Sequence, residues 1–267
     1  MNKYIELVDS VVIITGAAQG IGRVIAREFA LIGAKVVLVD INEEGRKVSD
    51  DLNSQGGNTL FIQADLVDKE SISEIVNATI NNFDTIDIII NNARPYLSNE
   101  SFPDNLTDWD KGMSILLKAP ALLAGYALPY LEKSKNASII NISSTNALTV
   151  SHQPLVYQVA KAALLHLTRC LSVELGAKKI RVNAICPGLV DQEDRERPLT
   201  SDIQNKYIVD RVVPLQRAAD PKEIFELIAY LCSTSSSYLT GQAIILDGGM
   251  SSLDQFQSAK NVIEYKD

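Results

Sequence analysis

The sequence predicts a doubly wound α/β fold, in which a parallel sheet of seven strands is covered by helices on both faces. Short apolar runs alternate with longer segments of helical periodicity, and the first run leads through a glycine-rich turn into a helix. No linker rich in Pro, Gly or Ser divides the 267 residues, and the composition does not change along the chain. We therefore expect a single domain over residues 1–267.

The composition is that of a globular protein and argues against several functions. With 46% hydrophobic and 22% charged residues, the chain can bury a substantial core. A net charge of -8 argues against a nucleic-acid surface and against an anionic membrane. Cys170, Cys186 and Cys232 are widely spaced, which favours reduced thiols in a cytosolic protein over a disulfide framework. His152 and His166 are the only histidines, so a metal site is poorly supported.

Neither a leader segment nor a membrane span is predicted. The first six residues lack an apolar signal region. The longest apolar stretch, 115–131, is interrupted by Lys118, Pro120 and Pro129, and we expect a buried or interface helix there. The expected location is therefore the cytoplasm.

The first strand is expected at residues 11–15, a continuous β-branched run typical of a strand that is buried on both faces. It is followed by the segment 16–22, Gly-Ala-Ala-Gln-Gly-Ile-Gly, and then by a helical pattern over 25–32. Glycines leave the backbone bare, so a pyrophosphate can approach the N–H groups at the positive end of the helix. The context predicts a nucleotide site, although the spacing is Gly-x-x-x-Gly-x-Gly.

The second strand, 35–39, ends at Asp40. An acid at this place accepts hydrogen bonds from the ribose hydroxyls of a dinucleotide and repels a 2′-phosphate, which favours NAD over NADP. The alternative is a cap for the turn or helix that begins at 42–44.

Two further strand ends carry polar residues. After the third strand, 59–63, Asp65 would meet the adenine edge, or Asp65 and Asp68 would cap the helix that begins near Lys69. After the fourth strand, 86–90, Asn91 and Asn92 suit either turn stabilisation or a ribose contact.

The second half of the chain continues the alternation. A helix is expected at 109–131, a strand at 138–142, a helix at 155–175, a strand at 180–185, a helix at 221–231 and a strand at 243–246. Between them, residues 189–216 lose the pattern and predict a loop that covers the substrate. The residues from Met250 to the end, 250–267, are either a frayed tail or a contact with a neighbouring subunit.

The chemistry is expected at Tyr157 and Lys161. Residues four apart lie on one face of a helix, and a cation close to a phenol favours the phenolate, so Tyr157 would exchange a proton with a substrate oxygen. Ser144 follows a buried strand and lies at the sheet edge where such folds place their ligands. The alternative is a surface pair without a catalytic role.

These motifs resemble those of the short-chain dehydrogenases/reductases over roughly residues 8 to 250. The matching segments are Thr15-Gly16-x-x-x-Gly20-Ile21-Gly22, Asn91-Asn92-Ala93, Ser144 with Tyr157-x-x-x-Lys161, residues 181–188, and Thr240-Gly241-Gln242 before Asp247-Gly248-Gly249. The resemblance implies a Rossmann-type sheet and hydride transfer between NAD(H) and an alcohol or carbonyl compound.

The resemblance also implies roles for single residues. Tyr157 would be the general acid/base, Ser144 would bind the substrate oxygen, and Lys161 would assist Tyr157 and bind the nicotinamide ribose. The residues expected to bind the cofactor are Gly16, Gln19, Gly20, Ile21, Gly22, Asp40, Asp65, Leu66, Asn92, Ala93, Tyr157, Lys161, Pro187, Gly188 and Val190.

Three positions depart from the family pattern. Leu116 stands where the family usually has an asparagine of the proton relay, and Arg94 replaces the glycine after Asn-Asn-Ala. Gln192 replaces a threonine and would still reach the carboxamide or the substrate. Arg94 would pair with an anionic substrate, or else with an acid such as Asp104 or one within 191–196.

These departures leave more than one function open. The first hypothesis is an active NAD-dependent dehydrogenase, and the second is an NAD-binding regulatory or assembly subunit with little turnover. A sugar-nucleotide epimerase or dehydratase is disfavoured, because no sizeable substrate domain follows the sheet. The resemblance and the apolar helices 110–131 and 155–175 suggest a homodimer or homotetramer, with core burial within one subunit as the alternative.

Overall fold

The computed structural model describes residues 4–98, 100, 102–191 and 201–263, and its centre is a parallel sheet. The strands lie in the order β3-β2-β1-β4-β5-β6-β7. They are β1 (Val11–Thr15), β2 (Lys35–Asp40), β3 (Asn58–Gln63), β4 (Ile88–Asn91), β5 (Ser138–Ile142), β6 (Arg181–Pro187) and β7 (Ala243–Leu246). The seven-stranded doubly wound sheet that the sequence predicts is confirmed.

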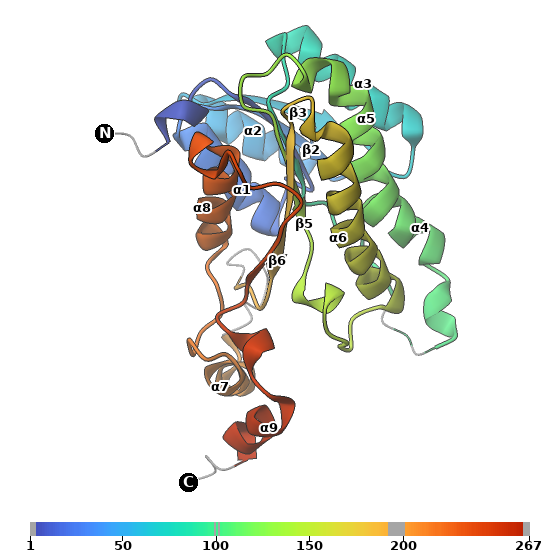
Figure 1. Ribbon diagram of the computed structural model, residues 1–267, viewed down its shortest axis with the longest axis vertical. Coiled ribbons are helices and arrows are strands. Elements are labelled where there is room, and N and C mark those ends of the chain that lie inside the picture. Colours follow the sequence, from blue (N-terminus) through green and yellow to red (C-terminus); the bar gives the residue numbers. More distant parts are fainter. Residues whose placement is uncertain (1–3, 99, 101, 192–200, 264–267) are drawn as a thin grey trace.

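Helices cover both faces of the sheet (Figure 1). One face carries α1 (Gly20–Leu31), α2 (Glu44–Ser54) and α8 (Pro221–Cys232), and the other carries α3 (Lys69–Phe83), α4 (Trp109–Met113), α5 (Ala119–Leu131) and α6 (Leu155–Gly176). Parallel strands buried in this way read as continuous apolar runs, and all five residues of β1 and of β5 are buried.

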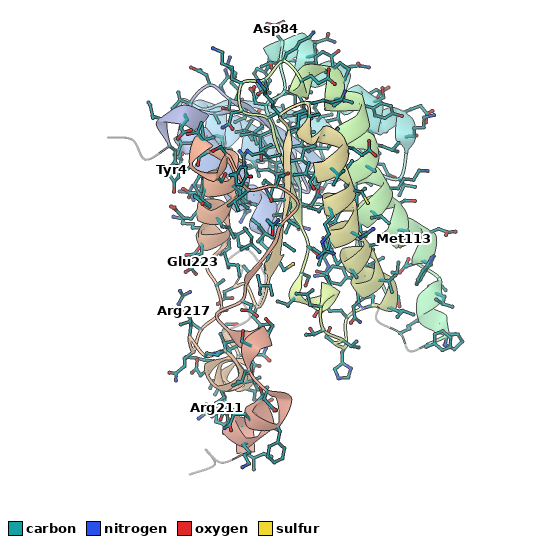
Figure 2. All side chains as sticks on the ribbon, in the orientation of Figure 1. Tyr4, Asp84, Met113, Arg211, Arg217 and Glu223 are labelled. Atoms are coloured by element: carbon teal, nitrogen blue, oxygen red, sulfur yellow. The ribbon has the colours of Figure 1, made fainter. Side chains whose placement is uncertain are left out.

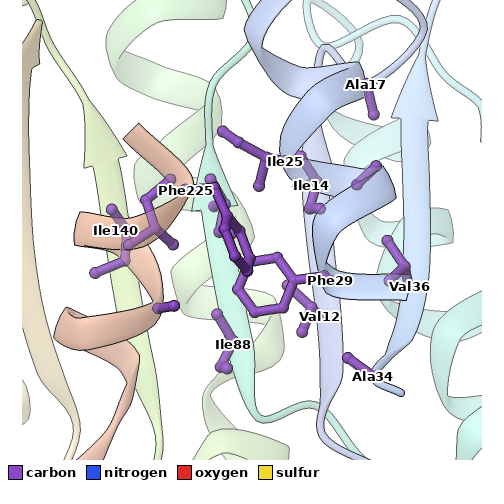
Figure 3. Close-up of a cluster of buried hydrophobic side chains, with 14 of the residues drawn as sticks. Val12, Ile14, Ala17, Ile25, Phe29, Ala34, Val36, Ile88, Ile140 and Phe225 are labelled. Atoms are coloured by element: carbon purple, nitrogen blue, oxygen red, sulfur yellow. The ribbon is translucent and has the colours of Figure 1, made fainter. Parts of the chain in front are cut away.

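The core on the first face joins α1 and α8 to the central strands. Figure 3 shows Phe29 of α1 and Phe225 of α8 between Ile88 and Ile14, with the two rings edge to face at a centroid distance of 5.2 Å. Such a pair contributes about 1 kcal/mol beyond the area that it buries. Both helices are thereby fixed on β1 and β4, between which the strand order reverses.

Strand order and burial place the functional edge of the sheet. Because β2 and β3 extend to one side of β1, and β4 to β7 extend to the other, the carboxyl ends of β1 and β4 flank the switch point of the sheet. Ligands of open α/β sheets bind at this point. Asp84, which is labelled in Figure 2, follows α3 shortly before β4 and marks the opposite, amino edge of the sheet.

The segment expected as a loop over 189–216 contains a helix, α7 (Ile203–Val212), so the expectation of an irregular segment is wrong for that part. The tail is also partly helical, as α9 (Gln255–Ile263). The two helices lie side by side beyond the carboxyl edge of the sheet (Figure 1), and Tyr207 donates from its hydroxyl to the carbonyl of Val262 at 3.1 Å. We call α7 and α9 together the arm.

The helix expected over 109–131 has an irregular middle. α4 leads into a π-helical turn, Ser114–Lys118, before α5 begins. Within the described residues, Trp109–Leu131 is long and apolar enough to cross a membrane by length and composition alone, and 39% of its window is buried. It packs on α3, β4 and α6, as a flanking helix of a sheet does.

Candidate active site

A cleft of about 870 Å³ opens at the carboxyl edge of the sheet and is lined by residues from the ends of six strands, β1 to β6, and from α6. The predicted site residues that line it are Gly16, Gln19, Gly20, Ile21, Asp40, Asp65, Leu66, Asn92, Ala93, Arg94, Ser144, Tyr157, Lys161, Pro187, Gly188 and Val190. Gly22 lies beneath the turn, and Gln192 lies outside the described residues. The structure thus brings together side chains that are far apart in the sequence.

The glycine turn between β1 and α1 leaves no room for a side chain at Gly16 or at Gly22. Gly16 has a φ of +68°, and a Cβ atom on it would lie 2.7 Å from the Cα atom of Ala93. A Cβ atom on Gly22 would lie 2.0 Å from the carbonyl oxygen of Gly16. Both contacts are with backbone atoms, so glycine is required at these two positions. The result is a bare cradle at the N-terminus of α1, which fits a pyrophosphate.

Asn92 holds this turn to the end of β4. Its side-chain nitrogen donates to the carbonyl oxygens of Thr15 and Gly16, each at 3.0 Å. The Thr15 hydroxyl in turn accepts from the backbone N–H groups of Asn92 and Ala93. The turn-stabilising interpretation of Asn92 is therefore what the structure shows, and a ribose contact stays a prediction.

Asn91 faces a buried polar chain instead. Its side-chain nitrogen donates to Oδ1 of Asn141 at 2.8 Å, and Asn141 donates to the hydroxyl of Thr168 on α6 at 2.9 Å. All three residues are buried. This chain ties β4, β5 and α6 together directly beneath the cleft.

Asp40 and Asp65 are the acids of the cleft among its described lining residues. Asp40 accepts from the N–H of Ala18 at 2.9 Å and from the N–H of Asn42 at 3.0 Å. It therefore braces both the glycine turn and the start of the next turn, which is the capping alternative, and the ribose contact stays a prediction. Asp65 accepts from the N–H of Val67, whereas Asp68 caps α3 by accepting from the N–H groups of Glu70 and Ser71.

Tyr157 and Lys161 lie on the first two turns of α6, in the wall of the cleft. Both are buried, with 7% and 3% of their surfaces exposed. Lys161 donates from Nζ to the carbonyl oxygen of Ile142 at 2.5 Å, and the same Nζ lies 5.7 Å from the centre of the Tyr157 ring. The two side chains therefore share one environment, as the sequence predicts.

Burial, as the larger cause, and the positive charge of Arg94 together lower the pKa of Lys161 to about 7, while the nearby Cys186 opposes the shift. Near neutral pH the amine thus exists in both charge states. Loss of contact with water is the main reason that the lysine gives up its proton so readily, and repulsion from the like charge of Arg94 adds to it.

Ser144 stands directly after β5. Its hydroxyl oxygen accepts from the N–H of Asn146 at 3.1 Å, so the hydroxyl proton remains to be donated. Next to it, Ser143 donates to the carbonyl oxygen of Lys161 at 3.0 Å. This bond fixes the end of β5 to α6, which holds Ser144 and Tyr157 at the same cleft.

Of the acids considered from the sequence as partners of Arg94, those within 192–196 lie outside the described residues. Among the described residues Arg94 has no ion pair, with Asp104 or any other acid, and its Nη2 donates to Oε1 of Gln153 at 2.7 Å. Its guanidinium carbon lies 4.6 Å from the centre of the Tyr157 ring. No pattern in the sequence pointed to Gln153, which lies in the loop before α6.

Leu116 occupies the π-helical turn and is 1% exposed. It lines a cavity of about 10 Å³ together with Thr15, Asn91 and Lys161. An apolar side chain therefore faces the lysine where the family usually has an asparagine. Irregular turns of this kind often mark functional sites, but residue periodicity does not reveal them.

The far wall of the cleft is formed by the end of β6. Gly188 lies so close to Asp247 that a Cβ atom on the glycine would be 2.7 Å from the Cβ atom of the aspartate. Lining residues that sequence reasoning missed are Asn42, Tyr96, Lys111, Asn146, Gln153, Leu189 and Met250. Within the described residues, no group of three or more His, Cys, Asp or Glu side chains is arranged to hold a metal ion.

Sheet order, glycine cradle and cleft define the chain as a Rossmann-type protein. A family model described as enoyl-(acyl carrier protein) reductase matches residues 16–251. The chain belongs to the short-chain dehydrogenase/reductase family, and it is an oxidoreductase of that family. The fold of this family binds a nicotinamide cofactor.

Individual relatives agree with this assignment. Over 250 residues the chain is 36% identical to the oxidoreductase UcpA of Salmonella typhimurium, covering 91% of this chain and 95% of the relative. It is 33% identical over 246 residues to 3-oxoacyl-(acyl-carrier-protein) reductase FabG of Chlamydia muridarum, covering 91% and 98%. The structure of L-sorbose reductase from Gluconobacter frateurii, complexed with NADPH and L-sorbose, matches with a TM-score of 0.84 and 30% identity over 93% of this chain and 98% of that one.

Proposed function

We propose that this chain is an NAD(H)-dependent oxidoreductase that transfers a hydride between the nicotinamide and a small alcohol or carbonyl compound, with Tyr157 as general acid/base. The observation that carries the proposal is the convergence of Ser144, Tyr157 and Lys161 on the cleft that also contains the glycine turn. A bound nicotinamide would supply the hydride acceptor or donor. The protein has to bind it, orient the substrate and move one proton.

The residues present fit such a cofactor. The bare backbone at Gly16 and Gly22 suits the pyrophosphate, and Asp40 at the end of β2 suits ribose hydroxyls. Asp40 also disfavours the extra phosphate of NADP by charge repulsion. The related L-sorbose reductase is complexed with NADPH, so the choice of cofactor is a point that measurement has to decide.

In alcohol oxidation, the substrate hydroxyl would give its proton to the phenolate of Tyr157, and the carbon that bears this hydroxyl would lose a hydride to the bound nicotinamide, so that a carbonyl group forms. Ser144 donates its hydroxyl proton to the substrate oxygen and holds it in place. When Lys161 is charged, its Nζ, 5.7 Å from the centre of the ring, stabilises the ionised phenol. Reduction of a carbonyl compound reverses each step, with Tyr157 as the acid.

The substrate class that we propose is an anion. At the end of the cleft away from Asp40 and Asp65, the described lining residues include Arg94 and Lys111 and no acid. A guanidinium group presents several N–H donors, and one of those of Arg94 is used by Gln153. The remaining donors suit a carboxylate or a phosphate.

This proposal is tested with the purified protein, NAD and NADP, and matched pairs of hydroxy acids and their amides. We expect NAD-dependent turnover that prefers the acids, and Arg94→Ala raises KM for an acid about tenfold or more while changing KM for the matched amide little. An equal rise in KM for the acid and for its matched amide would contradict the anionic class. If no hydroxy acid or amide were turned over with either NAD or NADP, the proposal that this chain is an active oxidoreductase would be contradicted.

Leu116 favours a second candidate function, an NAD-binding regulatory or assembly subunit. Its side chain can neither donate nor accept a hydrogen bond beside Lys161. Such a subunit would be stabilised by NAD or NADH in a thermal-shift assay and yet show no hydride transfer. Leu116→Asn then separates the two functions, because it should raise turnover only in a chain whose remaining machinery is competent.

A further inference from the structure

Arg94 lies in direct contact with the ring of Tyr157, in addition to its expected role in binding substrate. The guanidinium carbon lies 4.6 Å from the centre of the Tyr157 ring, within the range of a cation–π contact. The side chain is exposed, yet its Nη2 is tied to Gln153, four residues before Tyr157. A planar cation therefore lies against the ring of a buried phenol, and Gln153, two residues before α6 begins, tethers it.

Several charged or ionisable groups surround Tyr157, and Arg94 is one of them. From β4 the phenol meets Arg94, from its own helix it meets Lys161, and the buried thiol of Cys186 on β6 lies near Lys161. Lys111 of α4 lines the same cleft. An arginine keeps its charge at every working pH, whereas the buried Lys161 changes charge state near neutral pH. Arg94 is thus positively charged at every working pH, whereas the charge of Lys161 depends on pH.

We infer that Arg94 is a positioning residue for the proposed reaction: stacked on the ring of Tyr157 and tethered by Gln153, it fixes the direction of the phenol and adds a permanent positive charge beside it. The inference rests on the proposed function but not on the anionic substrate class. The guanidinium group contacts the ring of Tyr157, and its N–H groups that are not bonded to Gln153 can still donate to a substrate.

The experiment uses a neutral alcohol, for which an ionic contact between Arg94 and substrate plays no part. Arg94→Met removes charge and plane, Arg94→Lys keeps the charge alone, and Gln153→Ala loosens the tether. We expect kcat of Arg94→Met to fall about tenfold with little change in KM, because a misdirected catalytic group lowers the rate of the bound complex. The pH profile of kcat should move to higher pH in Arg94→Met, since loss of a positive charge favours protonation of all nearby groups.

Arg94→Lys should keep the pH profile and lose part of the rate, and so should Gln153→Ala. The matched control is Arg46→Met, because Arg46 stacks on Phe61 at 5.3 Å on α2, away from the cleft. A purely structural role for Arg94 would leave the profile in place. Wild-type kcat and an unmoved profile in Arg94→Met would overturn the inference.

A second readout does not depend on turnover. In protein labelled with 13C at lysine Cε, the Lys161 resonance is identified by its absence in Lys161→Met. Its pKa, about 7 in the unchanged protein, should be higher in Arg94→Met because a repelling charge is gone. If turnover is absent but this pKa rises, the proposed function fails and the contact stands; if the pKa is unchanged, the inference fails regardless of turnover.

Discussion

Lys161 is a buried amine without a carboxylate partner among the described residues. Its only hydrogen bond described is to the carbonyl oxygen of Ile142, and the nearest influential charge is the cation of Arg94. Proteins rarely keep a buried lysine in such surroundings, because removing the charge from water costs free energy. A buried ionisable side chain that loses its contact with water and has no partner of opposite charge is typical of a functional site.

This burial has a measurable effect on stability. Burial lowers the pKa of Lys161 to about 7, well below the value of an unfolded lysine. Between the two values the unfolded chain binds more protons than the folded one, so the free energy of unfolding rises with pH through that window. Relative to Lys161→Met, the wild-type protein should gain roughly 2 kcal/mol between about pH 7 and about pH 9.

Denaturant unfolding of both proteins without cofactor at the two pH values checks this. The comparison with Lys161→Met removes the contribution of all other titrating groups. A constant difference between the two proteins across the window would show that Lys161 is not desolvated.

Asp40 gives a second prediction at this scale. Its carboxylate lines the cleft and braces the glycine turn through the N–H of Ala18. We expect NAD to bind at least tenfold more tightly than NADP, and Asp40→Ser to reduce that ratio by about tenfold, or ~1.4 kcal/mol, because the repulsion of the 2′-phosphate is gone.

Fluorescence titration with NADH and NADPH measures both affinities. Asp51→Asn on α2 removes an exposed carboxylate and serves as the control for net charge. Comparable binding of the two cofactors by the unchanged protein would refute the role of Asp40.

Most of the candidate site could be predicted from the sequence, because each residue stands at a strand end or on one helix face. Asp40, Ser144 and Tyr157 follow from this logic alone. The contact of Arg94 with Gln153 could not be predicted, because the two residues are 59 positions apart and both lie in irregular segments. Pairing across loops is set by tertiary packing, which leaves no periodic signal.

Among the elements, the glycine turn is the one whose geometry the sequence dictates most strictly. Gly22 faces the carbonyl oxygen of Gly16 and the side-chain nitrogen of Asn92, with a Cβ position 2.0 Å and 2.5 Å from them. The start of α1 is therefore packed directly against the end of β1. Any side chain at this position has to displace backbone.

We predict that Gly22→Ala lowers the free energy of unfolding by about 2 kcal/mol or more, from overpacking of backbone, and abolishes NAD binding. Gly125→Ala is the matched control, because Gly125 is exposed on α5 and an added Cβ meets nothing within 4 Å. The control should stabilise the protein by about 0.5–1 kcal/mol through helix propensity. Thermal unfolding with and without NAD measures both effects. If Gly22→Ala and Gly125→Ala had the same stability and the same stabilisation by NAD, the role of Gly22 in the cradle would be contradicted.

The elements missed from the sequence are those that depend on one another. α7 follows a polar segment, and α9 lies near the end of the chain, so neither has a strong pattern of its own. Each is stabilised by the other, as in the bond between Tyr207 and Val262. Short helices gain most of their stability from packing rather than propensity, so the sequence alone predicts a loop and a tail at these positions. Figure 2 marks Arg211 in this arm, stacked at 3.5 Å on the ring of Tyr207.

At the scale of the whole molecule, the described sheet has helices on both faces, yet apolar surface remains. On α6, Val173 is 81% exposed, and α5 carries half-buried Leu122 and Tyr126. Family members typically form oligomers. We predict that light scattering gives the mass of a dimer or tetramer at micromolar concentration, whereas a monomer of 29.2 kDa would mean that these helices serve only their own subunit.

The sheet order was predictable because parallel strands joined by helices allow few topologies. The beginning of α8 at Pro221 also agrees with the helix expected at 221–231, whereas the direction of the arm was not predictable. Arg217 pairs with Glu223 in the first turn of α8, which Asp220 caps (Figure 2). These contacts lie where the chain returns from the arm to the sheet, and no local pattern specifies that path.

The account depends on proton transfer by Tyr157 at a cleft that binds a nicotinamide. The most direct test compares NADH formation by the unchanged protein and by Tyr157→Phe, with matched NAD affinity measured for both. Loss of one phenolic hydroxyl should reduce turnover about 100-fold or more while NAD still binds, because general acid/base catalysis is removed and the cradle is intact. Turnover by Tyr157→Phe equal to that of the unchanged protein would contradict the account.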